Sequence, residues 1–342
     1  MTHRVAAIDC GTNSIRLLIA DIRPQPDPET LRGATNPAPS SLPPLTDVTR
    51  EMRIVRLGEG VDRTGRLSET ALTRTMTALR EYAGLIAQAG PQAIRMVATS
   101  ATRDAANSQE FTDRVRATLG VAPEVISGDE EARLSFTGAT RELAGTALAA
   151  DGVCPPPYLV TDIGGGSTEF ILGEPGEADA RDRAPGGQVQ GQSVNIGCVR
   201  LTERHLHGDP PAHAEIAATS ADIDEALDQV AATVPAEKAR TLVGLAGSVT
   251  TVAAIALGLA EYDSVRIHHS RVSAPRVHEI ADDLLAMTRA ERAAIPVMHP
   301  GRVDVIGAGA LILDRTMARF GFTEVLVSEH DILDGIAWSL IP

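Results

Sequence analysis

The stretch AAIDCGTNSIRLLIADI, residues 6–22, decides the fold, because YLVTDIGGGSTEFILGE, residues 158–174, repeats its pattern. In each stretch an apolar run ends at an aspartate, a glycine turn with hydroxyl residues follows, and a second apolar run begins. Apolar runs of about four to eight residues on either side of a short glycine turn are typical of paired strands. Two copies of one strand–turn–strand unit predict a duplicated protein with two lobes.

Strands and helices alternate after each copy of this unit, which predicts an α/β protein. A helix opened by Ser68 and closed by Gly90 carries the clearest end signals. We expect further strands at 50–57, 93–98, 123–127, 193–201, 241–246 and 324–328, and further helices at 99–120, 128–144, 212–233, 249–260, 275–286, 288–293, 303–320 and 331–340.

Two stretches interrupt the pattern at matching places. Residues 23–49 hold seven prolines among polar residues, and residues 173–192 are rich in glycine and proline. Such compositions bury too little apolar surface to order themselves, so both are interpreted as long hairpin loops or disordered inserts.

Length and charge exclude several classes of protein. The chain has 342 residues, which suits two domains of moderate size. A net charge of −14 argues against a general nucleic-acid binder, since such proteins present a basic face. A polyanionic ligand would need local positive charge from arginines, backbone N–H groups and a metal ion. Lys238 is the single lysine, so a mechanism that needs a P-loop lysine is excluded.

The sequence also points to the cytoplasm. No apolar run approaches the roughly 18 residues that cross a bilayer, so no membrane span is expected. The apolar N-terminus is interrupted by Asp9, Asn13 and Arg16 and lacks a cleavage site, which argues against a signal peptide. The three cysteines are widely spaced and form neither a disulfide pattern nor a zinc pattern.

Three glycine turns are the candidate phosphate-binding sites: residues 9–14, 162–169 and 244–248. Such turns let backbone N–H groups approach phosphate oxygens, and the third also opens a helix whose N-terminus favours an anion. A single glycine turn is weak evidence, because hairpins use them routinely; three in this order are much stronger. The candidate residues are Gly11, Thr12, Asn13, Ser14, Gly164, Gly165, Gly166, Ser167, Thr168, Gly247 and Ser248.

Asp162 and Glu169 bracket the second turn, so both carboxylates can face one cleft. Hard oxygen ligands of this kind suit Mg²⁺, with water and phosphate completing its coordination, and Mn²⁺ is an expected substitute. Asp9 of the first turn is a further candidate, acting through a water molecule. The alternative is a turn with two capping acids and no metal.

The order of the turns resembles the superfamily of acetate and sugar kinases, heat-shock chaperones and actin. IDCGTNSIRLLI, ATSATRDAAN, ISGDEEARLSFTGA, DIGGGSTEFIL and AGSVTTVAA resemble, in sequence order, the motifs of the exopolyphosphatase/guanosine pentaphosphatase family, and VDVIGAGALIL and SEHDILDG are also similar. The resemblance covers nearly the whole chain apart from the two inserts, and it is to the short, two-domain members.

This resemblance implies roles for two further residues. Glu131 aligns with the family's catalytic glutamate, which activates water, and Arg103 with its phosphate-binding arginine. From the residues alone, Asp129 or Glu130 could equally be the base, and three acids at a helix start are usually caps that complement the helix dipole. Glu130 remains the second choice.

The resemblance also implies a fold and an activity. The fold would be two ribonuclease H-like lobes of the actin-like ATPase type, residues 1–128 and 129–330, with an active site between them and residues 331–342 packing back onto the first lobe. The activity would be hydrolysis of the terminal phosphate of polyphosphate, or of guanosine pentaphosphate to tetraphosphate, by a homodimer. The alternatives are an ATP-dependent kinase of the superfamily and a non-catalytic regulator that binds guanosine tetraphosphate or polyphosphate.

The remaining charged residues are assigned ordinary roles. The histidines, among them His268, His299 and His330, have no metal-ligand spacing and are expected on loops or as satisfied polar groups. Four further arginines could extend a positive channel, although the solvated surface is the preferred place for each: Arg56, Arg63, Arg66 and Arg200.

Overall fold

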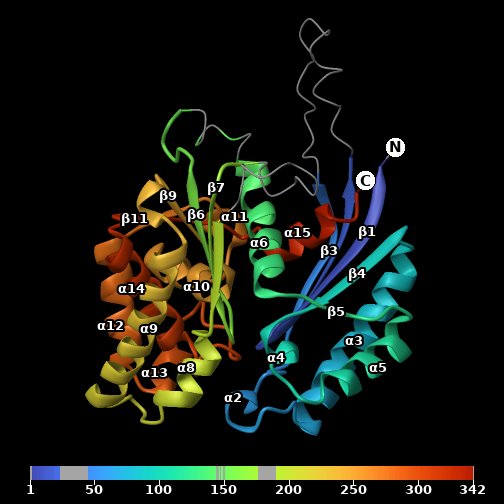
Figure 1. The fold of residues 1–342 in the computed structure, drawn as a ribbon, viewed down its shortest axis with the longest axis horizontal. Helices are drawn as coiled ribbons and strands as arrows, with labels where there is room; N and C mark the ends of the chain where they lie inside the picture. Colours follow the sequence, from blue (N-terminus) through green and yellow to red (C-terminus); the bar gives the residue numbers. More distant parts are fainter. Residues whose placement is uncertain are drawn as a thin grey trace, which may run out of the picture.

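Two lobes, each built on one sheet, make up the computed structural model, which describes residues 2–23, 45–143, 146, 148, 151–175 and 190–341 (Figure 1). Most of the two predicted inserts, residues 24–44 and 176–189, lies outside the described residues, but their predicted bounds are too wide, because residues 45–49 and 190–192 form strands instead of loop. Within the described part, no helix has both the length and the apolar character needed to cross a membrane.

The first sheet has the strand order β3-β2-β1-β4-β5. Its first three strands are antiparallel neighbours, whereas β4 runs parallel to β1 and β5 parallel to β4. The strands are β1 (His3–Cys10), β2 (Ser14–Ile22), β3 (Leu45–Ile54), β4 (Ala93–Ala98) and β5 (Glu124–Val125).

The second sheet repeats this connectivity. Its order is β10-β11-β9-β6-β7-β8, with an antiparallel β6–β7–β8 meander and β9 and β11 added in parallel. The predicted duplication is therefore confirmed by the topology, and β10 is an extra edge strand. The strands are β6 (Tyr158–Ile163), β7 (Thr168–Gly173), β8 (Gln190–Val194), β9 (Thr241–Leu245), β10 (Arg271–Ser273) and β11 (Glu324–Val327).

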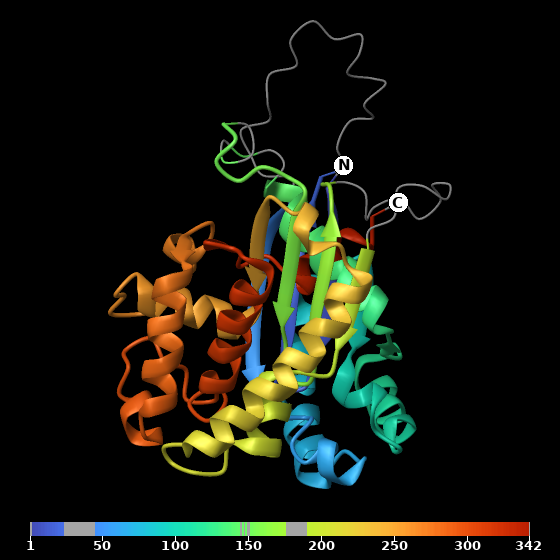
Figure 2. The ribbon, with the colours of Figure 1, turned by 60° about the vertical axis from the view of Figure 1, so that its left-hand side comes forward.

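Helices cover the outer face of each sheet (Figures 1 and 2). In the first lobe α3 (Glu69–Ala89) and α5 (Ser108–Leu119) do so, and α3 begins and ends as predicted: Ser68 caps it and Gly90 ends it in the left-handed conformation. In the second lobe the outer helices are α9 (His213–Thr233), α10 (Ala246–Ala256), α12 (Ala274–Ala286) and α14 (Ile306–Phe320).

Two helices, α6 (Gly128–Leu143) and α15 (Ile332–Trp338), lie between the sheets (Figure 1). Leu134 of α6 packs with α15 on the first sheet, while Phe136 and its neighbours on α6 pack on the second. The helices touch so closely that a Cβ on Gly138 would lie 1.8 Å from the carbonyl oxygen of Asp331. The helix that the sequence predicts to carry the catalytic glutamate, α6, therefore packs against both lobes.

Two predicted elements are wrong. The helix expected at 99–120 is broken into α4 (Ser100–Arg103) and α5, because Asn107 turns its side-chain amide onto the backbone of Leu67 instead of continuing a helix. The strand expected to run through 193–201 ends at Val194, and α8 (Cys198–His205) follows. Short helices connect several of the longer elements: α2 (Val61–Thr64), α11 (Ser264–Ile267) and α13 (Arg289–Ala293).

Candidate active site

The first two phosphate turns have the same backbone geometry. Gly11 N–H donates to the carbonyl oxygen of Ser14 at 2.9 Å, and Gly164 N–H donates to that of Ser167 at 3.0 Å. The turns face each other across the lobes and touch, since a Cβ on Gly166 would lie 2.6 Å from the Oγ1 of Thr12. Only glycine permits this approach.

A cavity of about 100 Å³ lies where the turns meet. Most of the predicted site residues line it: Asp9, Gly11, Thr12, Asn13, Ser14, Glu131, Asp162, Gly164, Gly165, Ser167, Glu169, Gly247 and Ser248. Folding therefore brings together residues from three turns and one helix that are spread over most of the chain.

Glu131 is the acid of its helix start that reaches this cavity. It is 8% exposed and lies in the first turn of α6. Asp129 is exposed, and Glu130 pairs with Arg95 at 2.6 Å on the outside of the helix. Burial raises the pKa of Glu131 to about 7, opposed by the charge of Arg103. A carboxylate with such a pKa suits a general base near neutral pH.

Arg103 lies behind Glu131 rather than on the cavity wall. Its Nη1 group donates to the Oε2 of Glu131 at 3.1 Å and to the carbonyl oxygen of Ile126 at 2.9 Å. The structure thus pairs the predicted phosphate ligand with the predicted base, and direct contact between Arg103 and phosphate stays a prediction.

Gly166 and Thr168 also lie off the cavity wall formed by the described residues. The hydroxyl of Thr168 donates to the carbonyl oxygen of Ile196, and Thr168 is fully buried. The hydroxyl group thus holds the turn against the segment before α8, and the predicted phosphate-binding role of Thr168, through its backbone N–H group, stays a prediction. Gly166 serves the contact between the lobes.

Asp162 and Glu169 are cross-strand partners on β6 and β7, so their side chains lie on one face. The Oδ2 of Asp162 accepts from Ser135 Oγ at 2.6 Å, and the Oε1 of Glu169 accepts from Ser193 Oγ at 2.7 Å. Burial raises the pKa of Asp162 to about 6 and raises that of Glu169 well above its usual range. Ser135 is four residues after Glu131, so α6 carries the candidate base and also orients a candidate metal ligand.

Arg16 is a site residue that the sequence analysis missed. It lies opposite Asp9 in the β1–β2 pairing and donates to the Oδ2 of Asp9 at 2.7 and 3.0 Å, and it also pairs with Asp331 at the start of α15. The sequence feature that could have identified Arg16 is its position two residues after Ser14, which places both side chains on the same face of the strand.

Arg302 was missed as well, and no local pattern marks it. Its Nη1 donates to the carbonyl oxygen of Gly247 and to Thr251, each at 3.1 Å. A Cβ on Gly247 would lie 2.1 Å from this guanidinium, so a larger residue there would displace the Arg302 side chain from its present position. Ala246, just before it, adopts the left-handed conformation at φ 67° and turns the chain into α10.

Arg16 and Arg302 also line a second, larger cavity. Its volume is about 470 Å³, and it shares Arg16, Ala246, Gly247 and Arg302 with the first. Apolar side chains, among them Val297 and Met298, form much of its wall, and Tyr262 adds an aromatic ring. A narrow polar chamber therefore adjoins a wider one at two arginines.

The donors of the narrow chamber fit a divalent cation. Four buried carboxylates, Asp9, Glu131, Asp162 and Glu169, face two lining arginines. Burial, and after it the like charges, raise the pKa values of these acids, and the negative charges would repel phosphate, so a hard cation would relieve the repulsion. Mg²⁺ commonly binds through one or two carboxylates and keeps water and phosphate as its other ligands.

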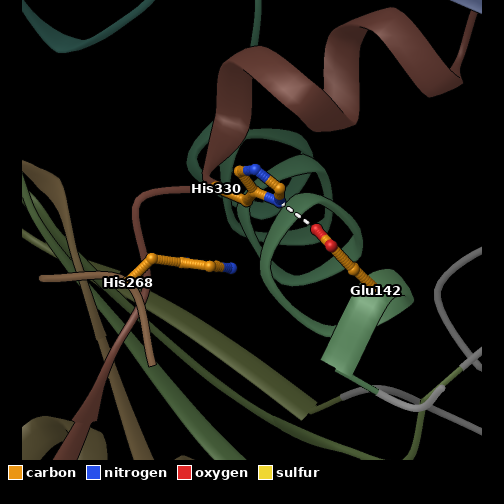
Figure 3. A group of neighbouring side chains, drawn as sticks. All are labelled: Glu142, His268 and His330. Carbon is orange, nitrogen blue, oxygen red and sulfur yellow. Dashed lines mark ion pairs between the residues drawn. The ribbon is translucent and has the colours of Figure 1, made fainter. Parts of the chain in front are cut away.

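A histidine cluster lies outside the chamber (Figure 3). Glu142, His268 and His330 bring possible ligand atoms within 4.8 Å of one another, which sequence spacing did not reveal. His330 Nδ1 pairs with the Oε2 of Glu142 at 2.6 Å, and this pairing outweighs burial and raises the pKa of His330 to about 9. His268 Nδ1 accepts from the N–H of Glu329, so the neutral ring carries its proton on Nε2, where a metal would need a lone pair. The cluster thus has the character of an ion pair rather than of a metal centre.

Comparison with known proteins gives one family. Residues 38–342 match the model of the Ppx/GppA phosphatase family. The chain is 48% identical to a Mycobacterium tuberculosis protein named exopolyphosphatase 2, over 98% of each chain. It is 27% identical to an Aeromonas salmonicida guanosine-5'-triphosphate,3'-diphosphate pyrophosphatase, over 98% of this chain and 59% of that protein.

Solved structures agree with this result. A crystal structure of an exopolyphosphatase-like protein is 44% identical and superposes with a TM-score of 0.84 over 98% of each chain. The Aquifex aeolicus Ppx/GppA enzyme is 29% identical, with a TM-score of 0.73 over 99% of this chain and all of that one. The two duplicated lobes are accordingly those of the actin-like ATPase fold.

Proposed function

We propose, because this chain belongs to the Ppx/GppA phosphatase family, that it hydrolyses the terminal phosphoanhydride bond of inorganic polyphosphate, with guanosine pentaphosphate as a second substrate. The observation that carries the proposal is the buried carboxylate of Glu131, whose pKa of about 7 places it between its two protonation states at the chamber where three phosphate turns meet.

The reaction is direct transfer of the terminal phosphoryl group to water. Glu131 orients a water molecule and accepts its proton as the water oxygen bonds to the terminal phosphorus. The bond between that phosphorus and the bridging oxygen breaks, and the shortened chain leaves with the bonding electron pair. Arg103 holds the Glu131 side chain in place through its 3.1 Å hydrogen bond.

The chamber walls bind the phosphate oxygens. The turns offer the backbone N–H groups of Gly165 and Gly247, whereas that of Gly164 is used within its own turn, and the hydroxyl groups of Thr12 and Ser248 lie beside them. Fixed N–H dipoles at the chamber wall stabilise the charge that spreads over the transferred group. Arg16 and Arg302 add positive charge at the junction with the larger cavity.

Attack at the chain end follows from the sizes of the two cavities. The inner chamber, about 100 Å³, is small beside the roughly 300–1,000 Å³ of typical ligand pockets, so only the end of a chain fits. The outer cavity, about 470 Å³, has room for further phosphates or for a nucleoside. Both proposed substrates can therefore present a terminal phosphate to Glu131.

Asp162 and Glu169 would hold Mg²⁺, with Asp9 contributing through water, and Mn²⁺ is the expected substitute. The bound ion would supply charge neutralisation at the phosphate oxygens. The chain's own contribution is to hold the two carboxylates in position, through Ser135 on α6 and Ser193 on β8. A cytoplasmic location, inferred from the sequence, and a homodimer, inferred from the family resemblance, remain predictions.

Binding of Mg²⁺ can be measured without turnover. The ion should raise the melting temperature of the wild-type protein, because it relieves repulsion among buried carboxylates and binds the folded state alone. Asp162→Asn should abolish most of this increase, whereas Asp151→Asn, an exposed aspartate away from the chamber, should keep it. Equal increases in the two variants would contradict the assignment of Asp162.

The substrate is tested by measuring phosphate release from short polyphosphate, long polyphosphate and guanosine pentaphosphate side by side. We expect release from at least one of them with Mg²⁺ and none after chelation. Formation of ADP from ATP with an added acceptor would instead indicate a kinase, and tight binding without release would indicate a regulator.

A further inference from the structure

Arg200 connects the two lobes beside the proposed site. It lies in α8, and its side chain is only 12% exposed, so the surface position expected from the sequence is wrong. The guanidinium makes three contacts in three directions. Its Nε donates to the carbonyl oxygen of Gly166 at 2.6 Å, its Nη1 to Asp62 and its Nη2 to Asp104, each at 2.5 Å.

These three partners come from different parts of the molecule. Gly166 belongs to the phosphate turn of the second lobe, Asp62 to α2 and Asp104 to the end of α4, both in the first lobe. In Figure 1, α8 lies beside α2 at the lower end of the molecule. One side chain thus fixes the second phosphate turn relative to two helices of the opposite lobe.

The position of Gly166 matters for both turns. A Cβ at Gly166 would lie 2.6 Å from the Oγ1 of Thr12, so the second turn rests directly on the first. Asp104 follows Arg103, whose guanidinium contacts Glu131 at 3.1 Å. A displacement of the Arg200 side chain would therefore move the turn that contains Gly166 and, through Asp104, the neighbouring Arg103, which contacts Glu131.

We propose that Arg200 is a positioning residue that holds the lobes closed and sets the spacing between the two phosphate turns. It lies outside the chamber wall and has no direct contact with the reacting atoms. Two aspartates and one carbonyl oxygen match the planar fork of an arginine, and lysine cannot reach all three at once. The predicted change in kcat rests on the proposed hydrolysis, whereas the predicted change in the distance between the lobes does not.

Arg204 provides a matched control. It lies one turn further along α8 and pairs with the same Asp62 at 3.0 Å, and its second partner is Asp222 of its own lobe. It makes no contact with Gly166 among the described residues. Arg204→Ala therefore removes the same charge from the same helix and leaves the phosphate turn in place.

The test combines kinetics with the distance between the lobes. Spin labels at Arg80→Cys on α3 and Glu225→Cys on α9 report that distance, and the three native cysteines are buried and so react poorly with the label. Arg200→Ala should lengthen or broaden the distance distribution and lower kcat about 10- to 100-fold, since a misplacement of about 1 Å can cost that much. Its KM should change less, and Arg200→Lys should recover part of kcat.

Arg204→Ala should leave the distance between the lobes unchanged and kcat within about twofold of wild type, because Asp62 remains paired with Arg200. Equal effects of Arg200→Ala and Arg204→Ala, or no effect of either, would overturn the proposal. If Arg200→Ala does not fold, Asp104→Asn tests the same link and should shift distance and kcat in the same direction. If the wild-type protein releases no phosphate, the proposed function fails, and the label distances still decide the role of Arg200.

Discussion

At the scale of single residues, Glu131 shows a balance between burial and charge. Burial raises its pKa and Arg103 lowers it, while the negative charges of Asp162 and Asp9 raise it further. The resulting pKa of about 7 means that the charged form is costly to the folded protein, because an exposed glutamate titrates near 4.5. A base of this kind gains reactivity at the expense of stability.

Glu131→Gln should therefore stabilise the metal-free protein at pH 8. The folded-state pKa lies above the unfolded one, so stability from this group is complete below pH 4.5 and lost as pH rises through about 7. Removing the charge should recover about 1–3 kcal/mol at pH 8, and little at pH 4.5. Calorimetric melting at both pH values, with chelator present, measures the difference. An equal gain at both pH values would contradict a raised pKa.

At the scale of elements, the contact between α6 and α15 joins the candidate base to the C-terminal segment. Gly138 of α6 lies against the backbone of Asp331, and Gly335 of α15 lies against Leu134. Asp331 caps α15 through the N–H of Leu333 and also pairs with Arg16. The two glycines thus allow α6 and α15 to pack in close contact. This contact holds α6, which carries Glu131, and also Asp331, which pairs with Arg16.

Gly138→Ala should destabilise the protein by about 1–3 kcal/mol or more, because the added methyl group overpacks a backbone contact. Gly84→Ala is the matched control: Gly84 lies inside α3, and a Cβ there meets no atom within 4 Å. That substitution should stabilise the protein by about 0.5–1 kcal/mol through helix propensity. Melting curves of the two variants compare them directly, and a neutral Gly138→Ala would show that the helices can separate freely.

Local signals predicted most elements and failed where long-range contacts decide. Ser68 and Gly90 determine the ends of α3 and are directly adjacent to it in the chain, so the sequence alone reveals those ends. The segment at Cys198 has the pattern of a strand, yet its N–H groups bond to the carbonyl oxygens of Gly164 and Gly165, which turns it into α8. The same distinction holds at the site. Arg16 follows from its strand position opposite Asp9, whereas Arg302 reaches Gly247 from 55 residues away.

At the scale of the whole molecule, charge opposes the proposed substrate. The net charge is −14, so a polyanion is repelled at long range, and among the described residues it is attracted near the arginines that line the two cavities: Arg16, Arg50 and Arg302. The lobes repeat one topology, and their turns meet at a single chamber. Attraction of the substrate therefore depends on residues close to the chamber, whereas the net negative charge of the whole molecule repels it.

Added salt should consequently increase kcat/KM for long polyphosphate. Raising ionic strength from about 0.01 to about 0.15 M shortens the Debye length from about 30 to about 8 Å, which screens the repulsion and leaves the buried contacts. We expect an increase of about threefold at fixed free Mg²⁺, and a smaller one for short polyphosphate, which carries fewer charges. A fall in kcat/KM with salt would instead reveal a basic channel over the substrate path.

The most direct measurement of the central claim is the initial rate of phosphate release from polyphosphate by Glu131→Gln and Glu130→Gln, both shown to be folded. Glu131 lines the chamber, and its neighbour Glu130 pairs with Arg95 outside it. Loss of a general base predicts a fall of about 100- to 10,000-fold for Glu131→Gln, with Glu130→Gln within about twofold of wild type. A wild-type rate in Glu131→Gln, or an equal loss in both variants, would contradict the account.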